Sequence, residues 1–308
     1  MKASSARGPA LLVAACTALA LGCESGSSGG GPSATGRPGA VPVVASTNVY
    51  GDIVRQIGEE RVEVASIISD PSQDPHSYEA GTQNQLALSR ARVVVENGGG
   101  YDDFVGRMLR GTKNASAQVV NAVQVSGKTP AAGQELNEHL WYDVPAMGKL
   151  ADRIADALAK AAPGDASAFR RNAEEFQAKL TSLQAEEARI KADHGGVAVA
   201  VTEPLPLYLT EASGLRNMTP ADFSEAVEEG TEVSPGSLRE TLDLLTGKRV
   251  KALVYNEQTA GPQTERVKRA AEDNGIPVVP VTETLPAGQD YVGWMTDNVH
   301  ALRRALGT

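Results

Sequence analysis

Four side chains able to bind a metal ion stand where a predicted strand gives way to a loop or helix. His76 lies in DPSQDPHSYE, His139 in NEHLWYD, Glu203 at the end of VAVAVTEP and Glu283 near the end of VPVTET. Two imidazoles and two carboxylates suit a divalent first-row cation, because the carboxylates offset its charge. The alternative is structural: carboxylates at strand ends often act as helix N-caps, and a histidine after a proline is often a plain loop residue.

Two stretches of alternating strand and helix signals frame these residues. Runs rich in β-branched residues predict strands at 41–49, 61–68, 91–100, 118–123, 197–204, 250–258 and 276–284. Helical segments separate them, and residues 291–306 form a closing helix. Strands that alternate with helices predict parallel βαβ units. We therefore expect an α/β fold with two lobes, each a parallel sheet flanked by helices.

The segment between these two stretches has no strand signal. Its apolar residues recur at helical spacing over 144–194, with an interruption at Pro163-Gly164-Asp165. This predicts one long linker helix with a kink, or two helices end to end, and a helical hairpin is the alternative. The predicted lobes are then residues 41–143 and 195–308.

A linker helix between two lobes predicts a cleft at their interface. In open α/β sheets, ligands bind beyond the carboxyl ends of the strands. His76 and His139 belong to the first lobe, while Glu203 and Glu283 belong to the second. If the lobes face each other, all four side chains converge on the cleft.

The N-terminus is typical of an exported protein. Residues 1–23 carry Lys2 and Arg7 before an apolar run too short to span a membrane comfortably. The run ends in Ala20-Leu21-Gly22-Cys23, which resembles a lipobox, and an ordinary cleaved signal is the alternative. Residues 24–40 are rich in Gly, Ser and Pro and suit a flexible tether. We expect a lipid anchor at Cys23 on the extracytoplasmic side of the cell membrane.

Composition excludes several other kinds of site. The 308-residue chain has a net charge of −9 and no basic stripe, which argues against nucleic acid as a partner. Its two cysteines, Cys16 and Cys23, both lie in the signal, so no thiolate is left for a metal. The remaining histidines are expected not to be ligands: His194 lies at a predicted helix end and His300 on the closing helix.

The order of these motifs resembles the metal-binding lipoproteins that serve zinc and manganese ABC transporters, over essentially the whole mature chain. The resemblance puts His76, in its aspartate-proline-histidine sequence, in the place of the first ligand. NEHLWYD resembles the family's histidine-x-tryptophan element and puts His139 in the second place. Glu203 stands five residues before the aromatic Tyr208, as the third ligand does, and Glu283 stands in the fourth place.

Other segments extend the resemblance or depart from it. VYNEQ resembles a family segment ending in glutamate-glutamine, and Tyr291 and Asn298 fit the final segment. The third ligand is glutamate rather than histidine, and Glu283 stands where aspartate is more usual. The histidine-rich loop of many zinc-specific members is missing from 127–137.

The resemblance implies a capture protein that performs no chemical step. It would bind Zn²⁺ or Mn²⁺ and hand the ion to an ABC permease and its ATPase, and we expect a monomer. Two carboxylates favour manganese whereas intrinsic affinity favours zinc, so the metal is left open. An exported zinc-dependent hydrolase, or a binding protein for an organic or chelated-iron solute, is the alternative.

Three further residues are expected to lie outside the set of metal ligands. Glu257 is a candidate acceptor that orients a ligand histidine, or else a plain surface residue. Trp141 and Trp294 are expected to be packing residues, and Trp141 is a candidate wall of the site beside His139.

Overall fold

The computed structural model describes residues 39–70, 78, 81–130 and 135–307. His76, Cys23, the predicted signal and nearly all of the predicted tether lie outside these residues. Among the described helices, none is both long and apolar enough to cross a membrane.

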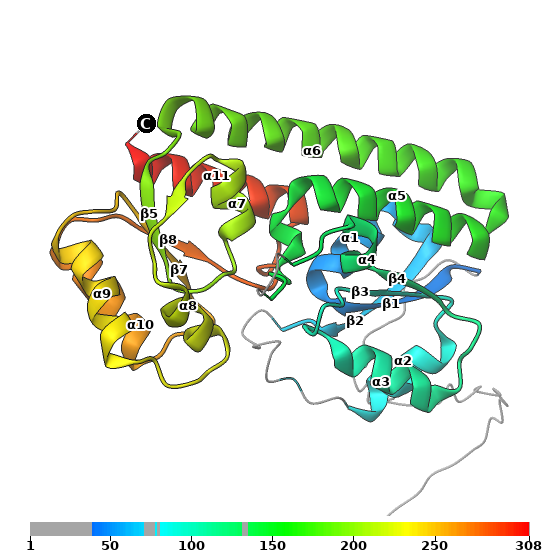
Figure 1. Ribbon diagram of the computed structural model, residues 1–308. Helices are drawn as coiled ribbons and strands as arrows, with labels where there is room; N and C mark the ends of the chain where they lie inside the picture. Colours follow the sequence, from blue (N-terminus) through cyan, green and yellow to red (C-terminus); the bar gives the residue numbers. More distant parts are fainter. Residues whose placement is uncertain (1–38, 71–77, 79–80, 131–134, 308) are drawn as a thin grey trace, which may run out of the picture. The chain divides into compact units, whose positions relative to one another are not determined.

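The first lobe is built on a four-stranded parallel sheet, as predicted (Figure 1). Its strands run in the order β2-β1-β3-β4: β1 (Val41–Thr47), β2 (Val62–Ile68), β3 (Val93–Glu96) and β4 (Gln118–Asn121). The helices of this lobe are α1 (Asn48–Gly58), α2 (Thr82–Arg90), α3 (Asp103–Thr112) and α4 (Ala122–Ser126). Short 3₁₀ turns cover Glu59–Arg61 and Leu140–Tyr142.

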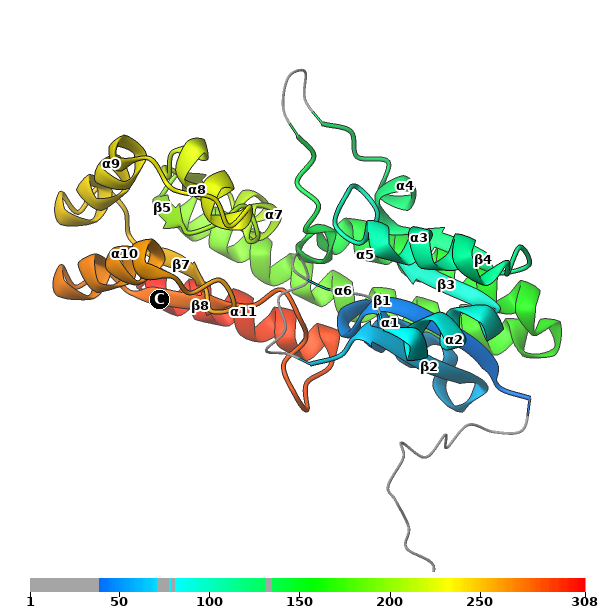
Figure 2. The ribbon, with the colours of Figure 1, turned by 90° about the horizontal axis from the view of Figure 1, so that it is seen from below.

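Helices cover both faces of this sheet because successive strand residues point to opposite sides. Val43 packs with α1 and α5 (Val144–Ala161), whereas Val44 and its neighbour Val94 pack with α2 and α3. Figures 1 and 2 show α2 and α3 on the face away from α5. Burial on both faces explains the nearly unbroken run of valines in these strands.

The second lobe repeats the plan with the strand order β6-β5-β7-β8. Its strands, also parallel, are β5 (Ala198–Val201), β6 (Arg216–Asn217), β7 (Leu253–Asn256) and β8 (Val278–Val281). Its helices are α7 (Leu207–Ala212), α8 (Ala221–Glu228), α9 (Pro235–Thr246), α10 (Pro262–Asp273) and α11 (Tyr291–Leu306). The two-residue strand β6 escaped the sequence analysis because it is too short to show a period.

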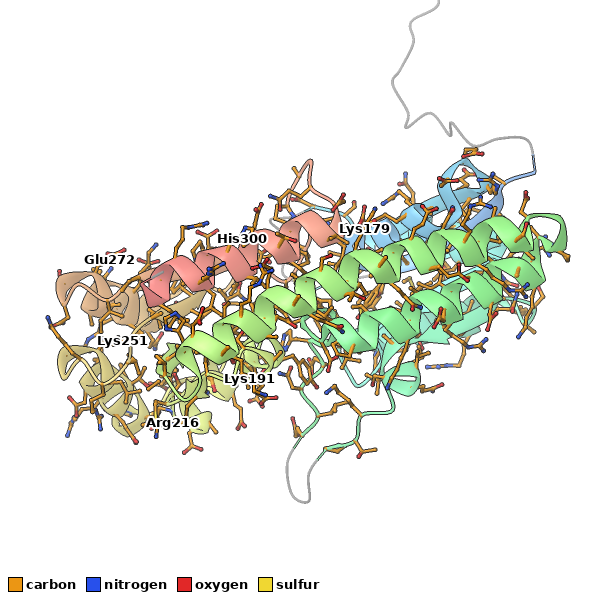
Figure 3. The ribbon with its side chains drawn as sticks, turned by 90° about the horizontal axis from the view of Figure 1, so that it is seen from above. Lys179, Lys191, Arg216, Lys251, Glu272 and His300 are labelled. Atoms are coloured by element: carbon orange, nitrogen blue, oxygen red, sulfur yellow. The ribbon has the colours of Figure 1, made fainter. Side chains whose placement is uncertain are left out.

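The predicted long linker helix is present as α6 (Ala166–His194), while the first part of the expected range, from residue 144, forms the separate helix α5. A turn at Pro163–Asp165 separates α5 from α6 (Ala166–His194), and the two helices pack side by side as a hairpin. Helix α6, with 29 residues, contacts helices of both lobes: α1 in the first, α7 and α11 in the second. Figure 3 shows α6 lying along α11. Helical periodicity is the same for both arrangements, so it could not distinguish them.

One apolar core continues through both lobes. Val43 of the first sheet, Phe176 of α6, Val201 of the second sheet and Leu302 of α11 all belong to one buried cluster. Side chains add hydrogen bonds between the lobes. Asn48 Nδ2 donates to Leu285 O, and Leu285 N donates back to Asn48 Oδ1, both at 2.9 Å. Shared packing of this kind favours small adjustments of the lobes over wide hinge opening.

A buried carboxyl on α6 makes stability depend on pH. Glu187 is only 4% exposed. Burial, followed by repulsion from Asp143, raises the pKa of the Glu187 carboxyl from 4.5 to about 7. Lys128 forms an ion pair with Asp143 at 2.6 Å. Burial, and then the charge of Glu187, raise the pKa of the nearby Tyr291 hydroxyl. The folded protein thus holds a proton that the unfolded chain releases.

We expect Glu187→Gln to remove part of the pH dependence of unfolding. The wild type has its full stability below the unfolded pKa of 4.5 and loses it as the pH rises through the folded pKa of about 7. Over this range, the free energy of unfolding of the wild type should fall by about 3 kcal/mol relative to that of the variant. Urea unfolding from about pH 4.5 to 8 measures it. Glu175→Gln, at an exposed position of the same helix, is the control, and parallel pH profiles for all three proteins would contradict the expectation.

Candidate metal centre

The second lobe brings two buried carboxylates together. Glu203 and Glu283 each stand two residues beyond a strand, β5 and β8, and each is 1% exposed. Between these strands lies β7, which ends at Asn256. The two protons on Asn256 Nδ2 are shared between the carboxylates, at 2.5 Å from Glu203 Oε2 and 3.0 Å from Glu283 Oε1. The order of the strands therefore sets up this three-residue cluster.

Gln258 holds the backbone that carries Glu283. Its Oε1 accepts from Glu283 N at 2.5 Å and from Thr284 N at 3.2 Å, while its Nε2 donates to Thr284 Oγ1 at 2.9 Å. Glu257, the candidate for orienting a ligand histidine, has an exposed side chain. Strand β7 ends at Asn256 and the chain turns over 257–259, so that Asn256 contacts both carboxylates and Gln258 contacts the backbone at Glu283.

The ring of His139 is oriented by Asn137. Asn137 Nδ2 donates to the carbonyl of Pro204 at 3.0 Å, so its Oδ1 is left as an acceptor. That oxygen lies 2.8 Å from His139 Nδ1, which must therefore carry the proton. A neutral imidazole with its proton on Nδ1 binds a metal ion through Nε2. Because Pro204 follows Glu203, this bond also ties the two ligand-bearing segments to each other.

Aromatic side chains enclose His139, which is 1% exposed. The ring of Trp141 lies edge-on at 5.2 Å, and that of Tyr101 at 6.2 Å. Tyr101 Oη donates to Glu283 Oε2 at 3.4 Å, linking the first lobe to the carboxylates of the second. Burial, and then the charge of Glu283, raise the pKa of the Tyr101 hydroxyl well above its usual range, so it remains a donor. Trp294 packs elsewhere, against Tyr142 and Tyr291.

The glycine cluster after β3 supports the segment that carries His139. Asn97 Nδ2 donates to Glu138 O at 3.0 Å. The carboxylate of Asp102 accepts from Asn97 N at 2.6 Å and Gly98 N at 2.8 Å. Gly98 has φ of +79°, and a Cβ there would lie 2.3 Å from the Asn121 amide. Glycine is therefore required at this position, which explains part of the NGGG sequence.

A further polar group lies beside His139. Glu228, the last residue of α8, places Oε1 3.4 Å from His139 Nε2. Within the described ranges, no three His, Cys, Asp or Glu side chains lie close enough to hold a metal ion together. His76 lies outside those ranges. His194 ends α6, and His300 lies on α11, where Figure 3 labels it.

The arrangement suits the binding of a cation. One imidazole and two buried carboxylates provide nitrogen and oxygen donors, and a divalent ion would neutralise both carboxylates. Asn137, Asn256 and Glu228 were missed by the sequence analysis. For Asn137 and Asn256 a signal existed: each stands within three residues of a candidate ligand or at the end of a predicted strand. For Glu228, in the acidic run EAVEEGTE, no such signal existed.

Comparison with known proteins shows similarity over nearly the whole described chain. The family model for the zinc-uptake complex component A, periplasmic, matches residues 43–305. The manganese-binding lipoprotein MntA of Bacillus subtilis is 26% identical over 286 residues, which is 86% of this chain and 89% of that protein.

Solved structures share the fold. The periplasmic zinc-binding protein TroA from Treponema pallidum superposes with a TM-score of 0.74 at 20% identity, covering 88% of this chain and 100% of that one. FpvC from Pseudomonas aeruginosa, in complex with Mn²⁺, superposes with a TM-score of 0.71 at 23% identity, covering 87% and 98%. At these identities the likeness concerns the fold alone.

Proposed function

Because this chain belongs to the zinc-uptake complex component A family, the substrate-binding proteins of metal ABC importers, we propose that it captures a divalent first-row cation between its lobes. Members of this family bind and deliver an ion, and they are not enzymes, so the hydrolase alternative is set aside. The proposed ligands are His76, His139, Glu203 and Glu283. The ion is then presented to a membrane permease.

The observation that carries this proposal is the shared amide of Asn256. The two carboxylates are each 1% exposed and face each other across this amide, at 2.5 and 3.0 Å from its nitrogen. A divalent cation bound by both carboxylates would offset the repulsion between them. His139 contributes a neutral nitrogen ligand whose tautomer Asn137 sets. Together these groups supply nitrogen and oxygen donors, and the two negative charges of the carboxylates would balance the charge of a divalent cation.

The direct test is a metal titration of the stripped protein. We expect one equivalent of Zn²⁺ or Mn²⁺ to bind, measured by calorimetry, and competition between the two ions to establish the preferred cargo. The several oxygen ligands that the carboxylates can offer favour manganese, whereas the intrinsic order of affinities among divalent metals favours zinc. Binding of neither ion, with binding of a chelated iron complex instead, would replace this proposal by the solute-binding alternative.

The position of the protein at the membrane is proposed from its N-terminus. Cys23 is the proposed site of a lipid anchor, and relatives such as MntA of Bacillus subtilis are named as lipoproteins. An anchor keeps a capture protein close to its permease, which raises the effective concentration for delivery. Mass spectrometry of membrane-extracted protein should show a diacylglyceryl modification at Cys23, and a free or cleaved cysteine would contradict it.

A further inference from the structure

Glu228 contacts the atom of His139 that a metal ion would use. We propose that Glu228 is an additional ligand for the transported ion, beyond the four assigned above. This inference rests on the proposed function, since it concerns the same ion. It adds a third carboxylate to the site, brought by α8 from the second lobe to a histidine of the first.

The contact is made at the binding nitrogen and not at the other ring nitrogen. Nδ1 of His139 is engaged by Asn137 at 2.8 Å, while Glu228 Oε1 lies 3.4 Å from Nε2. Two ligands about 2.1 Å from a shared ion, at a tetrahedral angle, stand about 3.4 Å apart. An ion can therefore be placed between Nε2 and Oε1 with little movement of either group.

The end of α8 is held in place, so the position of Glu228 is part of the fold. Phe223 anchors the helix in the core of the second lobe with 0% exposure. The helix ends at Glu228, and Gly230, two residues later, has a left-handed φ of +63°. Gly230 N donates to Val227 O at 3.1 Å, and Thr231 N donates to Ala226 O at 2.9 Å. These bonds close the last turn of α8 and hold the backbone that carries Glu228.

The position of Glu228 at the end of α8 also suits contact with a cation. A carboxylate in the last turn of a helix faces the negative end of the helix dipole, which is unfavourable. The Glu228 side chain is also only 18% exposed, so it loses part of its hydration. A bound cation would offset both effects. Its exposed neighbour Glu229 has neither the burial nor the histidine contact, and it serves as a matched control.

A third carboxylate has a consequence for selectivity. Oxygen-rich sites of higher coordination number suit Mn²⁺ better than Zn²⁺, which accepts four-coordinate sites. Removing Glu228 should therefore weaken the binding of Mn²⁺ more than that of Zn²⁺.

The test compares Glu228→Gln with Glu229→Gln in calorimetric titrations of stripped protein with Mn²⁺ and with Zn²⁺. We expect Glu228→Gln to lose about tenfold to 100-fold in Mn²⁺ affinity and less in Zn²⁺ affinity. The EPR spectrum of bound Mn²⁺ should change in this variant only, and Glu229→Gln should match the wild type. A thermal melt of each metal-free variant establishes that it is folded.

The outcomes separate this inference from the proposed function. If the wild type binds metal and Glu228→Gln binds both ions within twofold of it with an unchanged EPR spectrum, Glu228 is not a ligand, and the proposed function stands. If the wild type binds neither ion, the proposed function itself fails. Equal losses in Glu228→Gln and Glu229→Gln would also overturn the inference, because they would reflect net charge alone.

Discussion

His139→Ala should reduce the affinity for Zn²⁺ and Mn²⁺ by at least about 100-fold. The variant loses the buried nitrogen ligand whose tautomer Asn137 sets at 2.8 Å. Losing an outer partner of a ligand already lowers metal affinity by about tenfold to 100-fold, and losing the ligand should do more. Calorimetric titration of stripped protein with either ion measures the effect.

Two further variants make this result specific. His300→Ala, on α11 and remote from the carboxylates, should bind like the wild type. Asn137→Ala should fall between the two, because His139 keeps its nitrogen but is free to adopt the other tautomer. If His139→Ala bound either ion as tightly as His300→Ala does, the assignment of His139 would be wrong.

Asn256→Ala should destabilise the metal-free protein by about 2–4 kcal/mol and do far less to the metal-bound form. The substitution removes the donor shared by Glu203 and Glu283, at 2.5 and 3.0 Å, and leaves two buried carboxylates facing each other. A divalent ion takes over the role of that donor, because it neutralises both groups. Thermal unfolding with and without excess Zn²⁺ measures the difference.

The informative quantity is how much the added metal raises the melting temperature of each protein. This rise should be larger in Asn256→Ala than in the wild type. Asn298→Ala is a suitable control, since Asn298 is also buried but donates to the hydroxyl of Tyr142. A loss of stability that is the same with and without metal would show that Asn256 is only a packing residue.

The fold was largely predictable because its signals are local. Valine-rich strands between helical stretches predicted two parallel sheets, and both are present. The long linker helix was also predicted, but the hairpin that α5 forms with it was only the alternative to one continuous segment over 144–194. Whether two helices continue in line or fold back depends on the turn at Pro163–Asp165 and on the apolar face each helix offers to the other. These are tertiary contacts, which periodicity does not record.

The candidate site divides in the same way. Strand ends and residue types singled out His139, Glu203 and Glu283, and all three are buried at 1% exposure. His76 stays a prediction, since it lies outside the described residues. Hydrogen-bond partners could not be foreseen, because one residue of shift along a strand exchanges the inward and outward faces. That is why Asn256, and not Glu257, bridges the carboxylates.

The amino-acid sequence by itself determined which chemistry this protein can perform. It contains imidazoles and carboxylates suited to binding a divalent cation, and no cysteine beyond the predicted signal. Only the tertiary structure decided how those ligands are presented. The strand order places Asn256 between two glutamates, Asn137 contacts Nδ1 of His139, and α8 brings Glu228 to Nε2 of the same ring. The contacts made by Asn256 and Glu228 join residues distant in the chain, and only packing of the elements brings them within bonding distance.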